Sequence, residues 1–186
     1  MSPQTHRVKL TYGDYLSFPE DGKRHELIDG DHYVTPSPNT KHQTVSSNLH
    51  RILAGFVHDK QMGRVFAAPY DVVLSETDVL QPDLVFVSSS RSSIITESNI
   101  QGAPDLLIEI LSDSSRKTDE IVKRKRYETF GVQEYWVADP VLETMKVYRM
   151  TDRGYARVAE LTKEENHSLV TPLLPSLSIP IAEVFA

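Results

Sequence analysis

The sequence predicts a fold that mixes helices and strands, and three observations lead to this prediction. Short runs rich in Val, Ile, Leu, Phe and Tyr alternate along the chain with turn residues, which is typical of strands. The segment 39–59 instead places its apolar residues at helical intervals. The most apolar runs, 82–87 and 105–111, lie near the middle of the chain, and we expect them to be sheet strands buried on both faces.

In chain order, the first elements are a short helix, a hairpin and a long helix. Residues 11–18, before Pro19, predict the short helix. Asp29-Gly30 is a favoured turn pair with strand-like residues on both sides, so the surrounding segment predicts a hairpin. The long helix at 39–59 carries its apolar residues on one face: Val45, Leu49, Ile52, Leu53, Phe56 and Val57.

The later elements are mostly strands, with one further helix. The segment 88–102 is rich in serine and predicts a loop with one helical turn. Residues 116–130 predict a helix that ends at Gly131, because glycine readily adopts the left-handed conformation just past a last turn. The proline-rich tail excludes a long regular element. The strand candidates are 63–68, 70–75, 82–87, 105–111, 133–138 and 144–149, with weaker ones near 154–160 and 168–170.

Length and composition limit the class of protein. With 186 residues, the chain is most simply one domain spanning residues 1–186. The absence of cysteine excludes disulfides, thiol nucleophiles and Cys-ligated zinc. No apolar run approaches the roughly 20 residues of a membrane-spanning helix, and the first ten residues lack the apolar core of a signal peptide. We therefore expect no membrane association, and the cytoplasm is the default compartment.

The charge distribution bears on nucleic-acid binding. A net charge of −6 argues mildly against broad, non-specific binding to nucleic acid, which usually requires a basic surface. The segment 116–126 nevertheless holds six Lys or Arg residues against two acids. It either forms a solvated helix face or supplies phosphate contacts, and composition alone favours the first interpretation.

Glu109 is unusual because it lies inside the apolar run 105–111. Leu107 and Leu111 share its face of the expected strand, and the opposite face is apolar as well. A charged carboxylate that is buried without a partner costs several kcal/mol. Three explanations stay open: the side chain points to solvent, it pairs with a buried Lys or Arg, or it binds a metal ion.

Two other features are expected near Glu109. Asp83 follows Pro82 at the start of an apolar strand. It is either a turn residue before that strand, or a site residue at a strand end that lies next to Glu109 on the neighbouring strand. Asp119, Lys123 and Tyr127 are spaced i, i+4 and i+8, which keeps them on one helix face. Lys123 then either reaches the two carboxylates or forms a surface pair with Asp119. Two strand-end acids suit a hard cation such as Mg²⁺, which prefers oxygen ligands.

Several segments together resemble a known family. An acid after proline on one strand, an acid on the next and a nearby lysine are similar to the PD-(D/E)XK nuclease superfamily, which has the restriction endonuclease-like fold. The resemblance is closer to one branch, the Uma-two family, and covers nearly the whole chain. It implies an α/β (α+β) core with a mixed central sheet flanked by helices, an N-terminal hairpin and extra C-terminal strands. The matching segments are H-E-L-I-D-G (25–30), P-S-P-N-T-K-H-Q (36–43), A-P-Y-D-V-V-L (68–74), Q-P-D-L-V-F-V (81–87), G-A-P-D-L-L-I-E-I-L-S (102–112), D-E-I-V-K-R-K-R-Y (119–127) and G-V-Q-E-Y-W-V-A-D-P (131–140).

The resemblance implies a metal-dependent endonuclease that hydrolyses phosphodiester bonds in DNA. Asp83 and Glu109 would be catalytic ligands of Mg²⁺ or Mn²⁺, with Glu26 and the carbonyl oxygen of Ile110 as further ligands. No organic cofactor is implied. A homodimer is expected, because cutting both strands needs two sites.

The catalytic lysine departs from the superfamily's pattern. Leu111 stands at the position of the in-strand lysine, so the resemblance places the catalytic amine at Lys123, on the following helix, with Lys125 as the alternative. If neither lysine reaches the site, the chain binds without cleaving. The sequence therefore leaves open a non-catalytic nucleic-acid-binding or assembly protein with the same fold, and a protein that acts through protein partners alone.

Other residues keep two interpretations each. Glu26 is either a site residue or the partner of Arg24 or Lys23 in a hairpin salt bridge. His42 either faces the cleft or is a structural residue at a helix start. The remaining interpretations are a structural or supporting role for Asp71, core or dimer-surface packing for Tyr135 and Trp136, and a turn at Asp139-Pro140.

Overall fold

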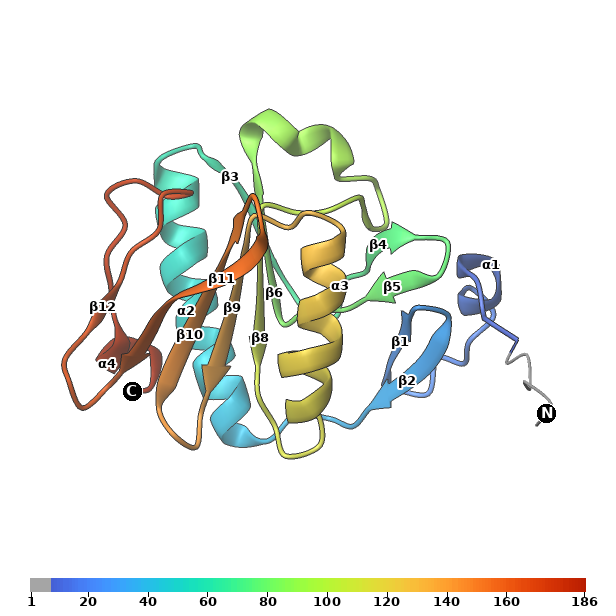
Figure 1. The fold of residues 1–186 in the computed structure, drawn as a ribbon, viewed down its shortest axis with the longest axis horizontal. Coiled ribbons are helices and arrows are strands. Elements are labelled where there is room, and N and C mark those ends of the chain that lie inside the picture. The colour runs from blue at the N-terminus through green and yellow to red at the C-terminus, as the bar shows by residue number, and fades with distance from the viewer. Residues whose placement is uncertain (1–7) are drawn as a thin grey trace.

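A six-stranded mixed sheet forms the centre of the structure, a computed structural model that describes residues 8–186 (Figure 1). Its strand order is β11-β10-β9-β8-β6-β3, and only β8 and β9 run parallel within it. The expectation of a mixed central sheet is therefore confirmed. The strands are β3 (Gly63–Ala67), β6 (Leu84–Ser88), β8 (Leu106–Ile110), β9 (Glu134–Asp139), β10 (Thr144–Thr151) and β11 (Gly154–Thr162).

A smaller five-stranded sheet contains the N-terminal hairpin. Its order is β2-β1-β5-β4-β7, and Figure 1 shows it beside helix α3. Asp29 and Gly30 join β1 and β2 with φ values of 52° and 75°, as a tight hairpin turn requires. The strands are β1 (Arg24–Ile28), β2 (Asp31–Thr35), β4 (Val72–Ser75), β5 (Asp78–Leu80) and β7 (Ile100–Gln101). Sequence patterns missed β5 and β7, which are too short to show a period.

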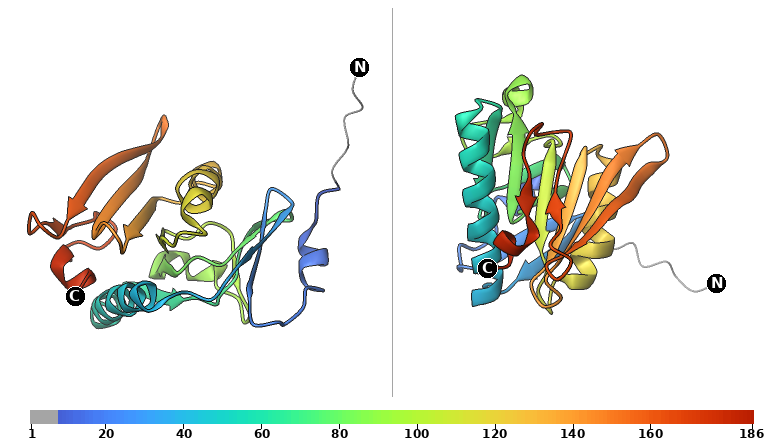
Figure 2. Two further views of the ribbon diagram at one scale, coloured as in Figure 1. Left: turned by 90° about the horizontal axis from the view of Figure 1, so that it is seen from below. Right: turned by 90° about the vertical axis from the view of Figure 1, so that its left-hand side faces the viewer.

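The two main helices cover opposite faces of the central sheet, as Figure 2 shows. Helix α2 (Thr40–Asp59) begins at Asn39, whose side chain accepts a hydrogen bond from the backbone N–H of His42. Its buried residues Val45, Leu49, Leu53 and Val57 pack on Leu84, Phe86, Leu106 and Ile108. On the other face, Tyr127 of α3 (Arg124–Thr129) packs with Val85, Leu107 and Tyr135. Strands β6, β8 and β9 are thus buried on both faces, which confirms the expectation for β6 and β8.

The helix predicted over 116–130 contains a π-helical segment. This segment, η2, spans Thr118–Lys123 and leads directly into α3. The prediction of a helix over 116–130 is confirmed, and six of its residues have π-helical geometry. The local sequence carries no signal for the wider turn, and π-helical turns of this kind often occur at functional sites.

Short elements complete the description. Helix α1 (Tyr12–Tyr15) is capped by Thr11, and η1 (Ser89–Ile94) is the expected turn in the serine-rich loop. The C-terminal segment forms β12 (Ser168–Leu169), β13 (Ile179–Pro180) and α4 (Ile181–Val184), whose apolar residues join the core around α2. None of the helices in residues 8–186 has the length and apolar character needed to cross a membrane. The start of the N-terminal stretch, residues 1–7, lies outside the described part of the chain.

Candidate functional site

Strand register brings Asp83 and Glu109 together. Strands β6 and β8 are antiparallel, with Leu84 opposite Ile108 and Val85 opposite Leu107. One residue further along this register, Asp83 stands opposite Glu109. Because side chains alternate along a strand, Asp83 shares a face with Val85, and Glu109 with Leu107. Both carboxylates therefore lie on the sheet face turned away from α2.

Glu109 is a buried, paired carboxylate, only 1% exposed. Its Oε1 accepts a hydrogen bond from Lys123 Nζ at 3.0 Å and another from the Tyr127 hydroxyl at 2.8 Å. The solvent explanation for Glu109 is thus wrong, and the cationic partner is Lys123. The expectation that Asp119, Lys123 and Tyr127 share one helix face is confirmed, because all three are buried against the same cluster.

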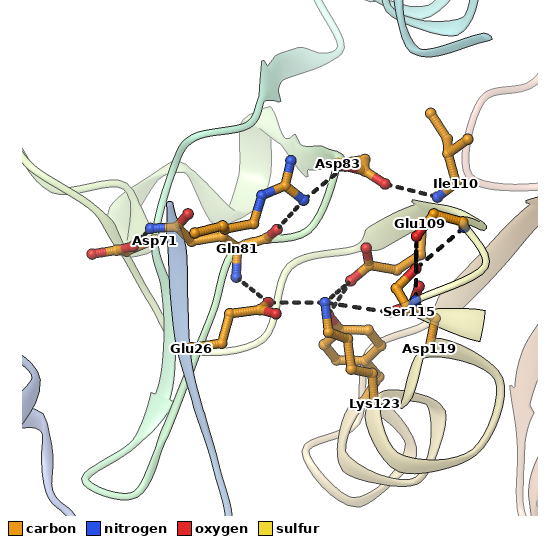
Figure 3. Close-up of polar contacts among 12 residues, drawn as sticks. Glu26, Asp71, Gln81, Asp83, Glu109, Ile110, Ser115, Asp119 and Lys123 are labelled. Carbon is orange, nitrogen blue, oxygen red and sulfur yellow. Dashed lines mark hydrogen bonds and ion pairs between the residues drawn. The ribbon is translucent and has the colours of Figure 1, made fainter. Parts of the chain in front are cut away.

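Lys123 lies among three carboxylates (Figure 3). Its Nζ is 2.9 Å from Glu26 Oε1, 3.0 Å from Glu109 Oε1 and 3.4 Å from Asp119 Oδ1. The alternative, Lys125, points away: its side chain is 75% exposed and its Nζ is 3.7 Å from Glu128. The amine at the site is therefore Lys123.

Asp83 is held by three donors. Arg24 Nη1 contacts its Oδ1 at 2.8 Å, while His42 Nε2 at 3.1 Å and the backbone N–H of Ile110 at 2.8 Å contact Oδ2. Burial by itself raises the pKa of Asp83, but the hydrogen bond from His42 and the charge of Arg24 outweigh it and hold the pKa below its usual value. Asp83 is therefore an ionised, fixed carboxylate.

The pKa shifts of Glu109 and Asp119 are opposite in direction to that of Asp83. Burial raises the pKa of Glu109 well above its usual value, and the charge of Lys123 only partly offsets this. Burial also raises the pKa of Asp119. For Lys123, burial lowers the pKa, but the charges of Glu109, Glu26 and Asp119 raise it well above its ordinary value. The amine stays protonated because one cation serves three acids.

The site has an excess of negative charge. Four carboxylates, Glu26, Asp83, Glu109 and Asp119, are each at most 3% exposed. Two permanent cations, Lys123 and Arg24, contact them. Asp83, Glu109, Asp119, Lys123 and Arg24 line one cavity of about 230 Å³ together with the loop 112–115; we call it the catalytic cavity after the role proposed for it. When all four carboxylates are ionised, the cluster at the cavity has two more negative than positive charges; burial raises the pKa of Glu109 and Asp119 and so opposes this state.

Glu26, Ile110 and His42, the other candidates for the site, all lie close to the carboxylate cluster. Glu26 does not line the cavity; its Oε1 is held by Lys123 and by the Gln81 backbone N–H at 2.8 Å, so the hairpin salt-bridge interpretation is wrong. Ile110 contacts Asp83 through its N–H. His42 does face the cavity.

The remaining candidates are structural. Asp71 Oδ1 accepts from the Tyr15 hydroxyl at 2.7 Å and from Gln81 Nε2 at 2.8 Å. Trp136 and Tyr135 are fully buried, which excludes a dimer-surface role. Asp139 caps the β9–β10 turn through the backbone N–H groups of residues 141 and 142, as expected.

Half of the basic segment 116–126 is neutralised internally. Arg116 pairs with Asp139, Lys123 with the site carboxylates, and Arg126 with Asp78. Arg124 lies over the Tyr148 ring at 4.9 Å. Phosphate binding by this segment stays a prediction that rests chiefly on its exposed lysines.

Sequence reasoning missed the role of Arg24 at the site. Arg24 and Glu26 are two residues apart on β1, so they point to the same side of the hairpin. The alternation along β1 could have shown that Arg24 lies on the same side of the hairpin as Glu26. It could not have shown that Arg24 pairs with Asp83, because Asp83 lies 59 residues away in sequence.

Comparisons with known proteins bear on the fold and on the family. The structure is similar to a crystal structure described as a "putative nuclease belonging to DUF820" from Anabaena variabilis, with 24% sequence identity and a TM-score of 0.79 over 95% of this chain and 97% of that one. This likeness shows the fold. No curated protein matches the chain significantly. Residues 12–182 match the Uma2 family, which is described as "Putative restriction endonuclease", and the chain therefore belongs to the Uma2 family.

Proposed function

We propose that residues 1–186 form one domain that acts as a metal-dependent endonuclease and hydrolyses phosphodiester bonds in DNA. The observation that supports this most strongly is the convergence of Asp83, Glu109 and Lys123 on one cavity. These residues come from two neighbouring strands and a helix, and the amine is 3.0 Å from a carboxylate oxygen. Family membership implies a nucleic-acid substrate.

The residues at the site fit a hard divalent cation. All the acidic groups are oxygen donors, which Mg²⁺ and Mn²⁺ prefer. With all four carboxylates ionised, the excess of two negative charges matches one such ion, and the buried Oδ1 of Asp119, 3.4 Å from Lys123 Nζ, has no hydrogen-bond partner in the described part of the chain. Residues 8–186 contain no ready-made group of three ligands, because Lys123 stands between the acids. Asp83 and Glu109 would hold the ion, with Glu26 and the Ile110 carbonyl oxygen as further candidates.

The chain's own residues would have separate roles in the reaction. When bound, a divalent ion lowers the pKa of water and polarises the scissile phosphate. Arg24 and His42 keep Asp83 ionised and fix its orientation. Tyr127 holds Glu109 in place. Lys123 keeps its proton and supplies a fixed positive charge beside the phosphoryl oxygens, where negative charge accumulates during the reaction.

Cleavage of supercoiled plasmid tests the proposal. Wild type should nick and linearise the plasmid with Mg²⁺ or Mn²⁺, while Glu109→Gln, which keeps size and hydrogen-bonding capacity, should not. Glu97→Gln removes an exposed carboxylate and is the matched control, expected to cut like wild type. Equal behaviour of wild type and Glu109→Gln would contradict the proposal.

One observation favours a second function, binding of nucleic acid without cleavage. Lys123 is saturated by three carboxylates, so the resting site needs no metal to compensate Glu109. Under this alternative, the protein shifts DNA in a gel-shift assay that contains EDTA, and it cuts DNA with neither Mg²⁺ nor Mn²⁺. Cleavage that depends on Glu109 excludes it.

For the endonuclease we further propose a homodimer, which sedimentation tests.

A further inference from the structure

A second cavity, which we call the flanking cavity, adjoins the catalytic cavity. It measures about 290 Å³. The two cavities share Arg24 and the segment 35–38, which links β2 to α2. Lys23, Gln43 and Gln81 supply the other polar side chains of the flanking cavity. A ligand that extends from the catalytic cavity along segment 35–38 therefore enters it.

The two cavities differ in charge. Carboxylates line the catalytic cavity, whereas the lining of the flanking cavity contains Lys23 and Arg24 and no acid. Lys23 Nζ is 3.2 Å from Asp21, but 58% of the Lys23 side chain is exposed. An exposed pair of this kind is worth little, so Lys23 can exchange Asp21 for another anion. The flanking cavity thus suits a negatively charged group beside the site of metal chemistry.

Parts of the wall of the flanking cavity are held in place, and some of its side chains are amides. Pro36 and Pro38 restrict the backbone of the shared segment. The Gln81 amide is held because its Nε2 donates to Asp71 Oδ1 at 2.8 Å and to the Tyr15 hydroxyl at 3.1 Å. Gln43 projects from α2 with an exposed side chain. Amide side chains of this type recognise base edges, and lysines contact phosphates.

We propose that the flanking cavity binds the nucleotide next to the scissile phosphodiester of a DNA strand. Lys23 contacts the phosphate of that nucleotide and the Gln43 amide contacts its base. This inference rests on the proposed nuclease function and adds to it the place where the substrate strand leaves the metal site. The strand runs along segment 35–38, with one phosphate at Asp83 and Glu109 and the neighbouring one at Lys23.

Binding of labelled oligonucleotides in EDTA tests the inference without cleavage. Fluorescence anisotropy is measured for single-stranded and duplex DNA between 50 and 200 mM KCl. Loss of one phosphate contact in Lys23→Ala should reduce the salt slope of log K by about 0.9 on duplex, or about 0.7 on a single strand. On duplex, the advantage of wild type over Lys23→Ala then shrinks by about 3.5-fold across this range. Gln43→Trp, which fills the cavity from an exposed helix position, should also weaken binding.

Lys60→Ala is the matched control. Lys60 is exposed at the C-terminal end of α2, whereas Gln43 lies near the other end. Lys60→Ala should bind DNA with the wild-type salt slope of log K. A slope change for Lys23→Ala on either probe supports the inference and shows which form of DNA the cavity takes. An unchanged slope, or wild-type affinity in Gln43→Trp, overturns it. If wild type cuts DNA but Lys23→Ala keeps the wild-type salt slope of log K, the flanking site is contradicted and the nuclease function is not. If wild type neither binds nor cuts DNA, the nuclease function itself is contradicted.

Discussion

Replacing Lys123 by methionine removes the cation that contacts Glu26, Glu109 and Asp119 together. The wild-type Nζ is 2.9–3.4 Å from an oxygen of each carboxylate, and all four groups are at most 3% exposed. Removing one partner of a buried ion pair costs about 3–5 kcal/mol, because the remaining charge is left uncompensated. We expect a loss of unfolding free energy of this size at pH 8.

The loss should depend on pH in a defined direction. Burial raises the pKa of Glu109 and of Asp119 already in wild type. Without Lys123 these pKa values rise further in the folded state, while the unfolded values stay near 4. A raised folded pKa contributes stability below the unfolded pKa and loses it as pH rises through the folded pKa. Lys123→Met should therefore be less destabilised at pH 5 than at pH 8.

Urea unfolding followed by tryptophan fluorescence measures this. Trp136 is the single tryptophan and is fully buried, so its emission reports the loss of the core. With an m value of about 2–3 kcal/mol/M, the pH 8 midpoint should fall by about 1–2.5 M. Lys125→Met, at an exposed lysine two residues on, should change stability by less than about 0.5 kcal/mol. Equal midpoints for the two variants, or a larger loss at pH 5, would refute the reasoning.

Three further predictions concern stability. Tyr127→Phe removes the 2.8 Å hydrogen bond to Glu109 and should cost about 1.5–3 kcal/mol in a urea titration. Arg24→Met leaves Asp83 with a higher pKa and should cost about 3 kcal/mol at pH 7; because the wild-type pKa is lowered, this difference should shrink as pH falls below about 4 and disappear only below the lowered wild-type pKa. Gly154→Ala should lower the melting temperature, since φ is 96° and the added Cβ meets the Glu128 carboxylate.

Each of these predictions has a distinguishing control. Tyr12→Phe removes a hydroxyl that accepts a hydrogen bond from the neutral Asn99 amide at 2.9 Å, so it should cost less than Tyr127→Phe in the same urea titration, and an equal or larger cost would contradict the assigned role of Tyr127. For Arg24→Met, a difference from wild type that grows below pH 4 would contradict the assigned role of Asp83. Gly55→Ala lies in α2 with open space around its Cβ and should stabilise the protein by about 0.5–1 kcal/mol. A melting temperature for Gly154→Ala at or above that of wild type would show that the turn tolerates a side chain.

Much of the fold was predictable because local patterns were strong. The apolar face of residues 40–59 and the Asp29-Gly30 turn placed α2 and the hairpin correctly. The separation into two sheets was not predictable, because it depends on which distant strands pair. The three-residue strand β5 joins β1 to β4, and its sequence shows no strand period.

The site was predictable in part for the same reason. Helical spacing placed Lys123 and Tyr127 on one face, and proximity along the chain placed that face near Glu109. Periodicity left the direction of Glu109 open, and the β6–β8 register resolves it by setting Asp83 opposite. Arg24 could not be assigned to Asp83 from sequence, since no local pattern encodes a contact across 59 residues.

The most direct measurement is the anomalous diffraction of crystals soaked in Mn²⁺. The account predicts a peak between the carboxylates of Asp83 and Glu109 in wild type and none at that place in Glu109→Gln. A wild-type enzyme that cuts DNA with Mn²⁺ bound elsewhere, or with no peak between these two side chains, would contradict it.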